Sequence, residues 1–201
     1  MLESGLAKCR PRFRSVEREK IGIMPSSASN EHRGQCARLA ACVVALLLWM
    51  GFIFFMSAND GDHSQGMSDG VASAVLSAVW PGYSGMSPGE QTAVVESLSF
   101  PVRKAGHFSE YAVLGLLAFA TLRQAQTLRS SQALRNTRKI APAAAGAVVV
   151  AFLYACFDEF HQLFVAGRSG QPFDVGVDTA GALMAVSIAV AVVRMRERRR
   201  V

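Results

Sequence analysis

An uncharged run of twenty residues, from Leu39 to Ala58, constrains the fold of this chain more than any other feature. An α-helix rises about 1.5 Å per residue, so such a run spans about 30 Å, the hydrocarbon thickness of a bilayer. The run follows a polar segment of 38 residues and lacks a small-residue cleavage site, which disfavours a cleaved signal peptide. We therefore expect it to remain as a transmembrane helix.

Three more apolar stretches follow, at about 105–122, 140–160 and 172–193. The composition agrees with a membrane protein, since 51% of the residues are hydrophobic and only 18% are charged. The four cysteines show no close spacing, so neither a disulfide framework nor a thiolate metal site is indicated. The sequence predicts an all-α, polytopic membrane protein with four transmembrane helices.

The basic residues predict the orientation of these helices. Eight Lys and Arg precede the first span, five lie between the second and third spans, and five follow the fourth, out of 21 in the chain. Because Lys and Arg beside membrane spans are retained in the cytoplasm, we expect both termini to be cytoplasmic. The net charge of +6 is explained by this pattern and by attraction to anionic membrane lipids, so we assign no nucleic-acid partner.

The segments outside the spans differ in pattern. Residues 1–38 and 194–201 are basic, and we expect the first of these segments to be a poorly ordered cytoplasmic tail. Between the first two spans, apolar residues recur at helical spacing from Val71 to Trp80. After a Pro/Gly-rich break, Ser87, Pro88 and Glu90 form a helix-start signal. The sequence thus predicts two short interfacial helices in this first external segment.

Ionisable residues of the last three spans gather at the outer end of each span. In the second span, Lys104, His107 and Glu110 share one helical face at i, i+3 spacing. The third span ends with Asp158, His161 and their neighbours, and the fourth begins with acidic residues at i, i+4 spacing. With the polar neighbours Tyr111 and Gln162 and with Arg168 of the short connection between the last two spans, the full polar set is Arg103, Lys104, His107, Glu110, Tyr111, Asp158, Glu159, His161, Gln162, Arg168, Asp174 and Asp178.

Two interpretations of this gathering are open. An ionised side chain at bilayer depth costs at least about 2.5 kcal/mol, so such residues are not placed there at random. In the first interpretation they form a structural network, in which Arg168 and Lys104 neutralise the acids. In the second they line a functional cavity that opens to the outside, which we favour.

Imidazoles and carboxylates on three helices could perform general acid-base chemistry. The same groups could bind a divalent cation through His107, Glu110, Asp158, His161 and Asp178. Their spacing is not a metal-binding signature, so we assign neither a metal ligand nor a cofactor. No nucleophile elbow, zincin motif, P-loop or dinucleotide fingerprint is present.

Two stretches resemble a known family. They are VRKAGHFSEYAVLGLL, residues 102–117, and DEFHQLFVAGRSGQPFDVGVDTAGAL, residues 158–183. Together they resemble the VanZ-like family of polytopic bacterial membrane proteins, whose recurrent polar positions fall on the twelve residues of the set above, followed by Gly181. The resemblance implies a four-helix membrane domain over residues 39–193 in the bacterial cytoplasmic membrane.

The resemblance also implies a role in the cell envelope, because the founding member is associated with low-level resistance to the lipid-tailed glycopeptide teicoplanin. We expect the cavity to bind an amphiphilic or lipid-linked envelope ligand. Candidate orienting or catalytic residues are His107, Glu110, Asp158, His161 and Asp178; candidate ligand-binding residues are Arg103, Lys104, Tyr111, Glu159, Gln162, Arg168 and Asp174.

Two alternatives remain open. One is a membrane enzyme that performs acid-base or metal-assisted chemistry on a lipid headgroup. The other is a structural or partner-binding module, in which Gly115, Gly146, Gly176 and Gly181 only let helices approach closely.

Overall fold

The computed structural model describes residues 26–129 and 140–199. Within these ranges the chain forms five α-helices and a short 3-10 helix: α2 (Ser26–Ser57), α3 (Gly61–Val79), η1 (Tyr83–Gly85), α4 (Pro88–Arg129), α5 (Ile140–Gln162) and α6 (Pro172–Arg198). All except α3 and η1 are long and apolar enough to cross a membrane. The prediction of an all-α chain is confirmed, and the described residues contain the four candidate membrane spans expected from the sequence.

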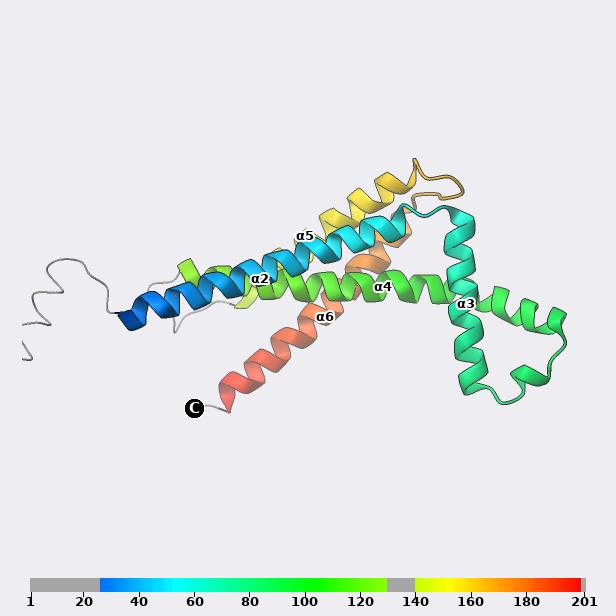
Figure 1. The fold of residues 1–201 in the computed structure, drawn as a ribbon, viewed down its shortest axis with the longest axis horizontal. Helices are drawn as coiled ribbons and strands as arrows, with labels where there is room; N and C mark the ends of the chain where they lie inside the picture. Colours follow the sequence, from blue (N-terminus) through cyan, green and yellow to red (C-terminus); the bar gives the residue numbers. More distant parts are fainter. Residues whose placement is uncertain (1–25, 130–139, 200–201) are drawn as a thin grey trace, which may run out of the picture.

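The helices are arranged so that the ends of α2 and α5 and the start of α6 lie on one side of the molecule (Figure 1). In Figure 1, α2 runs along α4, whereas α6 crosses α4 at a steep angle. The short helix α3 crosses α4 near its N-terminal part (Figure 1). The C-terminal ends of α2 and α5 and the start of α6 lie on this same side. The polar residues predicted to gather therefore come from helix ends that do lie together.

A stripe of alanines on α5 allows the spans to pack closely. Ala143, Ala147, Ala151 and Ala155 repeat every fourth residue, and each is at most 1% exposed. Small side chains at this spacing let neighbouring helix backbones approach, as is usual in membrane bundles. Larger apolar side chains such as Leu48, which is 71% exposed, lie on the outside and are suited to contact lipid.

The helix α3 packs on α4 through small and polar residues. Its buried face consists of Ser64, Ser68, Ala72 and Leu76. The carboxylate of Asp69 accepts hydrogen bonds from Ser99 of α4 and from Gln65. Because the valines of α3 remain exposed, its apolar face is uncovered, as expected of a helix that lies at a membrane surface.

The second predicted short helix is not separate, which corrects the sequence prediction. The helix-start signal is present: the Ser87 amide donates to the Glu90 carboxylate at 2.8 Å. From Pro88, however, the helix continues through Pro101 to Arg129 as one helix. A proline removes a single backbone hydrogen bond and adds a local clash, which strongly helical flanking segments tolerate.

Both ends of the bundle also differ from the prediction. Residues 26–38, predicted to belong to a poorly ordered tail, are helical and continue the first span toward the N-terminus. This stretch contains Arg, Gln and Ala, which propagate a helix once the span has nucleated it. The helix α6 likewise runs past 193 to Arg198. The predicted basic loop between 122 and 140 is helical as far as Arg129, where α4 ends. Residues 1–25, 130–139 and 200–201 lie outside the described residues.

Candidate functional site

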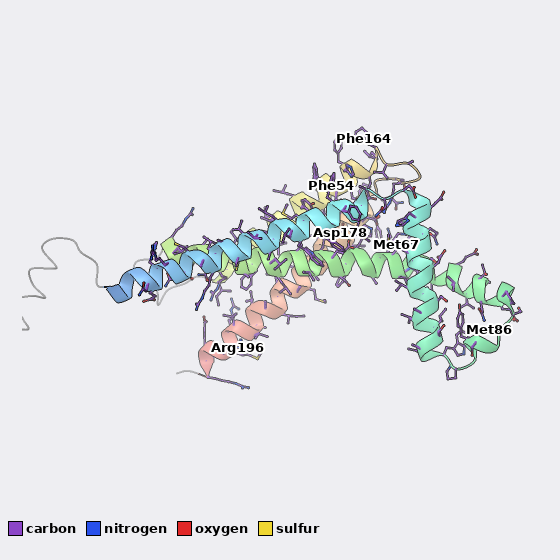
Figure 2. All side chains as sticks on the ribbon, viewed as in Figure 1. Phe54, Met67, Met86, Phe164, Asp178 and Arg196 are labelled. Atoms are coloured by element: carbon purple, nitrogen blue, oxygen red, sulfur yellow. The ribbon has the colours of Figure 1, made fainter. Side chains whose placement is uncertain are left out.

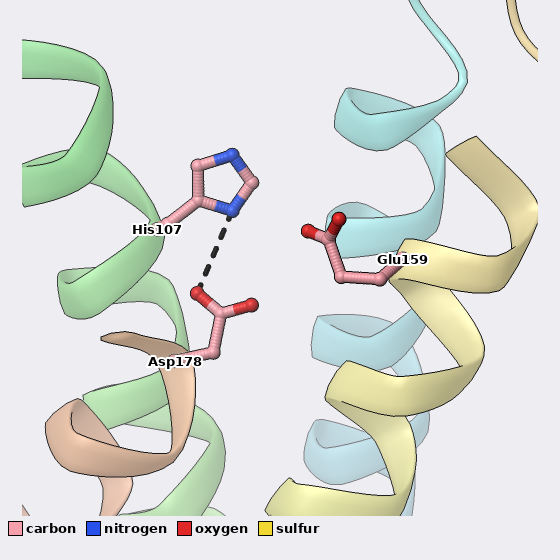
Figure 3. A group of neighbouring side chains, drawn as sticks. All are labelled: His107, Glu159 and Asp178. Carbon is pink, nitrogen blue, oxygen red and sulfur yellow. Dashed lines mark ion pairs between the residues drawn. The ribbon is translucent and has the colours of Figure 1, made fainter. Parts of the chain in front are cut away.

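Three polar side chains from three different spans meet at the centre of the candidate site. They are His107 of α4, Glu159 of α5 and Asp178 of α6, and one ligand atom of each lies within 4.8 Å of the others. Figure 3 shows the three side chains pointing toward one another from their helices. Asp178 also lies where the helices cross, on the side of Phe54 and Met67 and far from Arg196 at the other end of α6 (Figure 2). We call His107, Glu159 and Asp178 the His-Glu-Asp cluster.

Glycines fix the spacing of the helices that carry the cluster. A Cβ atom at Gly181 would lie 2.2 Å from the carbonyl oxygen of Phe108, the residue after His107. One at Gly115 would lie 3.0 Å from Ala182 of α6. A Cβ at Gly181 would overlap the Phe108 backbone, and one at Gly115 would be crowded by Ala182. Glycine at both positions therefore lets α4 and α6 approach closely enough for His107 and Asp178 to lie near each other. Gly176, in contrast, has open space around it, so the packing role proposed for it is not supported.

Several buried polar atoms of the site have no hydrogen-bond partner among the described residues. Asp178 is fully buried, and neither of its carboxylate oxygens forms a hydrogen bond. The same holds for one carboxylate oxygen of Glu159 and the hydroxyl of Tyr111. Buried polar groups are satisfied in the great majority of folded proteins. Such a concentration of buried polar atoms without partners is chemically suited to hold a proton, an ion or a polar group of a bound molecule.

The ionic contacts only partly follow the predicted network. Lys104 forms an ion pair with Asp174, and both side chains are largely buried. His107 Nδ1 lies 3.6 Å from Asp178 Oδ1, which is too long for a hydrogen bond. Among the described residues, Arg168 donates to no carboxylate; its Nε donates to the Asn59 carbonyl at 3.1 Å. The interpretation as a purely neutralising network thus accounts for Lys104 and Asp174 but not for the cluster.

Arg168 lies in the connection between α5 and α6. Its guanidinium group donates to carbonyls at the end of α2, and so holds this connection against α2. Burial lowers the pKa of Arg168, and so does nearby Arg103, whereas the carboxylates of Asp158, Glu159 and Glu110 raise it. The positive charge of Arg168 therefore lies within electrostatic reach of the acids, although it forms no ion pair with one in the part of the chain that the structure describes.

A pocket of about 530 Å³ lies next to the cluster, between α2, α3 and α4. We call it the α3 pocket. Its polar lining includes Arg103, His107, Glu110, Asp158 and Arg168. Its apolar lining is Ile53, Met56, Met67, Val71, Val75 and Val102. His107 belongs to both the pocket wall and the cluster, so it connects the two.

Other predicted site residues lie around this centre. The His161 ring packs against the Phe54 ring, with the two ring centres 4.5 Å apart. His161 does not line the α3 pocket. Gln162 is buried and donates to Asp158 at 3.3 Å. Tyr111 lies in the apolar core between the spans. The structure thus brings the predicted residues to one end of the bundle, and their individual roles stay predictions.

The sequence prediction missed the contribution of α2 and α3. Ser57, Ser64 and Ser68 line the α3 pocket, together with Met67. Their signal in the sequence was the i, i+4 spacing of Ser64, Ser68 and Ala72, which marks a small-residue helical face. The sequence analysis used only the apolar residues from Val71 to Trp80, and the valines among them lie on the exposed face of α3.

The greater part of the chain matches a known protein family. A family model described as VanZ/LLP1 matches residues 42–194. This range includes most of the four spans and all residues of the α3 pocket and the cluster. No curated protein and no solved structure matches the chain.

Proposed function

The chain belongs to the VanZ/LLP1 family of membrane proteins, and from this premise we propose that it binds an amphiphilic or lipid-linked molecule of the bacterial cell envelope in the α3 pocket. The observation that carries the proposal is the division of the pocket wall into an ionic part and an apolar part. The charged groups of Arg103 and Arg168 suit an anionic headgroup, and the His107 imidazole can donate a hydrogen bond to it. Met67 and Val71 of α3 suit the first part of a hydrocarbon tail.

The size of the pocket supports this assignment. A volume of about 530 Å³ is within the usual range of small-molecule sites, about 300–1,000 Å³. It is large enough for a headgroup and the nearest part of a lipid tail. Val71 and Val75 are about half exposed, at 53% and 52%, so a longer tail can continue along α3 into the bilayer.

The distribution of positive charge supports an outward-facing pocket in the cytoplasmic membrane. The C-terminal ends of α4 and α6 carry Arg129 and Arg196. The α3 pocket contacts α4 at residues 102–110, in the N-terminal half of that helix, and Met67 of the pocket wall lies far from Arg196 (Figure 2). Since basic ends are retained in the cytoplasm, both termini face the cytoplasm and the pocket faces the exterior. Lipid-linked precursors of the cell envelope are available on that side.

A pair of probes with the same tail tests the proposal. Undecaprenyl phosphate and undecaprenol differ only in the phosphate group, and their binding can be measured on the purified protein in nanodiscs. We expect undecaprenyl phosphate to bind at least tenfold more tightly. Arg103→Gln should weaken the binding of undecaprenyl phosphate by at least about tenfold, since a hydrogen bond to a charged group contributes about 1.5–3 kcal/mol.

The matched control is Arg194→Gln, which removes a charge near the C-terminal end of α6, outside the α3 pocket. It should leave the affinity for undecaprenyl phosphate unchanged. Equal affinities for the two probes, or equal losses in the two arginine variants, would refute binding of the headgroup in this pocket.

A further inference from the structure

We propose that the His-Glu-Asp cluster binds a divalent transition-metal ion, of the chemical class of Zn²⁺ or Mn²⁺, directly behind the pocket wall that His107 forms. One imidazole nitrogen and two carboxylate oxygens form a common ligand set for such ions. Hard ions such as Mg²⁺ prefer oxygen ligands and retain their water, so the imidazole disfavours them.

The distances fit an ion after a small adjustment of the side chains. The three ligand atoms lie within 4.8 Å of one another. A point equidistant from three atoms at that separation is about 2.8 Å from each, and Zn²⁺ binds nitrogen and oxygen at about 2.0–2.2 Å. Each ligand atom would therefore move by less than about 1 Å. The ligands come from three helices, and glycine contacts already fix the spacing of α4 and α6, so the site is largely preformed.

A bound cation would neutralise the negative charge of the cluster. Glu159 and Asp178 together carry two negative charges when ionised, and they are 5% and 0% exposed. Lys104 is paired with Asp174, Arg103 donates to Gln65, and Arg168 donates to backbone carbonyls at the end of α2, so none of these three cations forms an ion pair with the cluster among the described residues. A divalent ion bound by two carboxylates and a neutral imidazole gives a site of zero net charge, which removes most of the cost of burying two like charges.

The hydrogen-bond pattern is an independent observation. Both oxygens of Asp178 are free of hydrogen bonds within the part of the chain that the structure describes, as are His107 Nδ1 and Glu159 Oε1. The other oxygen of Glu159 accepts a hydrogen bond from the Gln171 backbone N–H at 2.8 Å. This contact orients the carboxylate toward the cluster, as hydrogen bonds from outer-shell groups orient metal ligands in other proteins. The unsatisfied atoms are thus the atoms that would bind the ion.

The ion would also serve the α3 pocket. Three protein ligands leave at least one coordination position open. Since His107 lines the pocket, an anionic oxygen of a bound headgroup could occupy that position. This last step rests on the proposed function, whereas the metal site itself does not.

Zn²⁺ titration of the purified protein, without a histidine tag, tests the site. The four cysteines are replaced by serine first, because Cys36 lies 3.6 Å from His32 and could bind Zn²⁺ adventitiously. After treatment with EDTA, we expect one Zn²⁺ per chain, a higher thermal midpoint with Zn²⁺, and weak or no binding of Mg²⁺. Asp178→Asn and His107→Gln should each weaken Zn²⁺ binding by about a hundredfold or more.

Matched controls are Glu96→Gln and His63→Gln, which replace exposed residues outside the cluster and should retain the wild-type affinity. X-ray absorption at the zinc edge of the otherwise unaltered cysteine-free protein gives a readout that does not depend on how the variants fold; we expect one imidazole and otherwise oxygen ligands. Failure of the protein to bind Zn²⁺, or a spectrum with two or more imidazoles, would overturn the metal site. Zn²⁺ binding that does not change the affinity for undecaprenyl phosphate would overturn only its link to the headgroup.

Discussion

Replacing Gly181 by leucine is expected to leave almost no folded protein in the membrane. A Cβ at this position would lie 2.2 Å from the Phe108 carbonyl oxygen and 3.2 Å from the Phe108 Cα. These are backbone atoms, so α4 and α6 would have to separate along their shared contact. Overpacking a core typically costs about 1–3 kcal/mol, and a leucine against the backbone exceeds that range. The measurement is the yield of monodisperse protein after detergent extraction.

Gly176→Leu is the matched control for this prediction. Gly176 lies on the same helix and is exposed, and a Cβ atom at this position would have no atom within 4 Å outside its own stretch of helix. A leucine there should accumulate at nearly the wild-type level. Equal yields of the two leucine variants would show that close approach of α4 and α6 at Gly181 does not determine the fold.

Lys104→Glu is expected to cause the second large effect, a loss of stability. It places a second carboxylate against Asp174, whose side chain is 8% exposed. Lys104 also lies 5.0 Å from the centre of the Phe100 ring, so its stem and charge are held on both sides. Breaking a buried ion pair costs about 3–5 kcal/mol. For a chain of this size the thermal midpoint should fall by at least about 6 °C, measured in detergent.

Exchanging the two charges of the pair distinguishes a loss of ionic attraction from a loss of side-chain packing. Lys104→Glu combined with Asp174→Lys restores opposite charges across the same contact between α4 and α6. The double variant should recover a substantial part of the lost thermal stability. If it is as unstable as the two single changes added together, the ion pair is not what joins these helix ends.

The spans could be predicted from the sequence because each follows a local pattern. A charge-free run such as 39–58 is sufficient to identify a transmembrane helix. The boundaries were less predictable: a helix continues past the edge of its apolar run when the next residues, as at 26–38, are compatible with a helix. Pro101 illustrates the same limit, since whether a proline ends a helix depends on the packing around it.

The site was predictable as a gathering of residues but not as a geometry. Helical spacing and span direction were enough to bring His107, Asp158 and Asp178 to one end of the bundle. The choice of Glu159 over its neighbours as a partner of His107 depends on the rotation of α5, which the contacts of its alanine stripe determine. The α3 pocket depends on how α3 crosses α4, and no local pattern encodes that crossing.

The proposed function depends on one arrangement: polar groups from separate spans share a pocket that opens to the exterior. Two positions on α4 report on it. Gly106 lines the α3 pocket and has room for a side chain, and Arg129 is exposed at the opposite end of the same helix. They are separated by about 35 Å along the helix axis, more than the hydrocarbon thickness of a bilayer.

The most direct test is labelling of intact cells with a charged, membrane-impermeant maleimide, using cysteine-free protein that carries either Gly106→Cys or Arg129→Cys. We expect Gly106→Cys to be modified in intact cells, and Arg129→Cys to be modified only after the membrane is permeabilised. Modification of Arg129→Cys in intact cells, with Gly106→Cys modified only after permeabilisation, would contradict an outward-facing pocket.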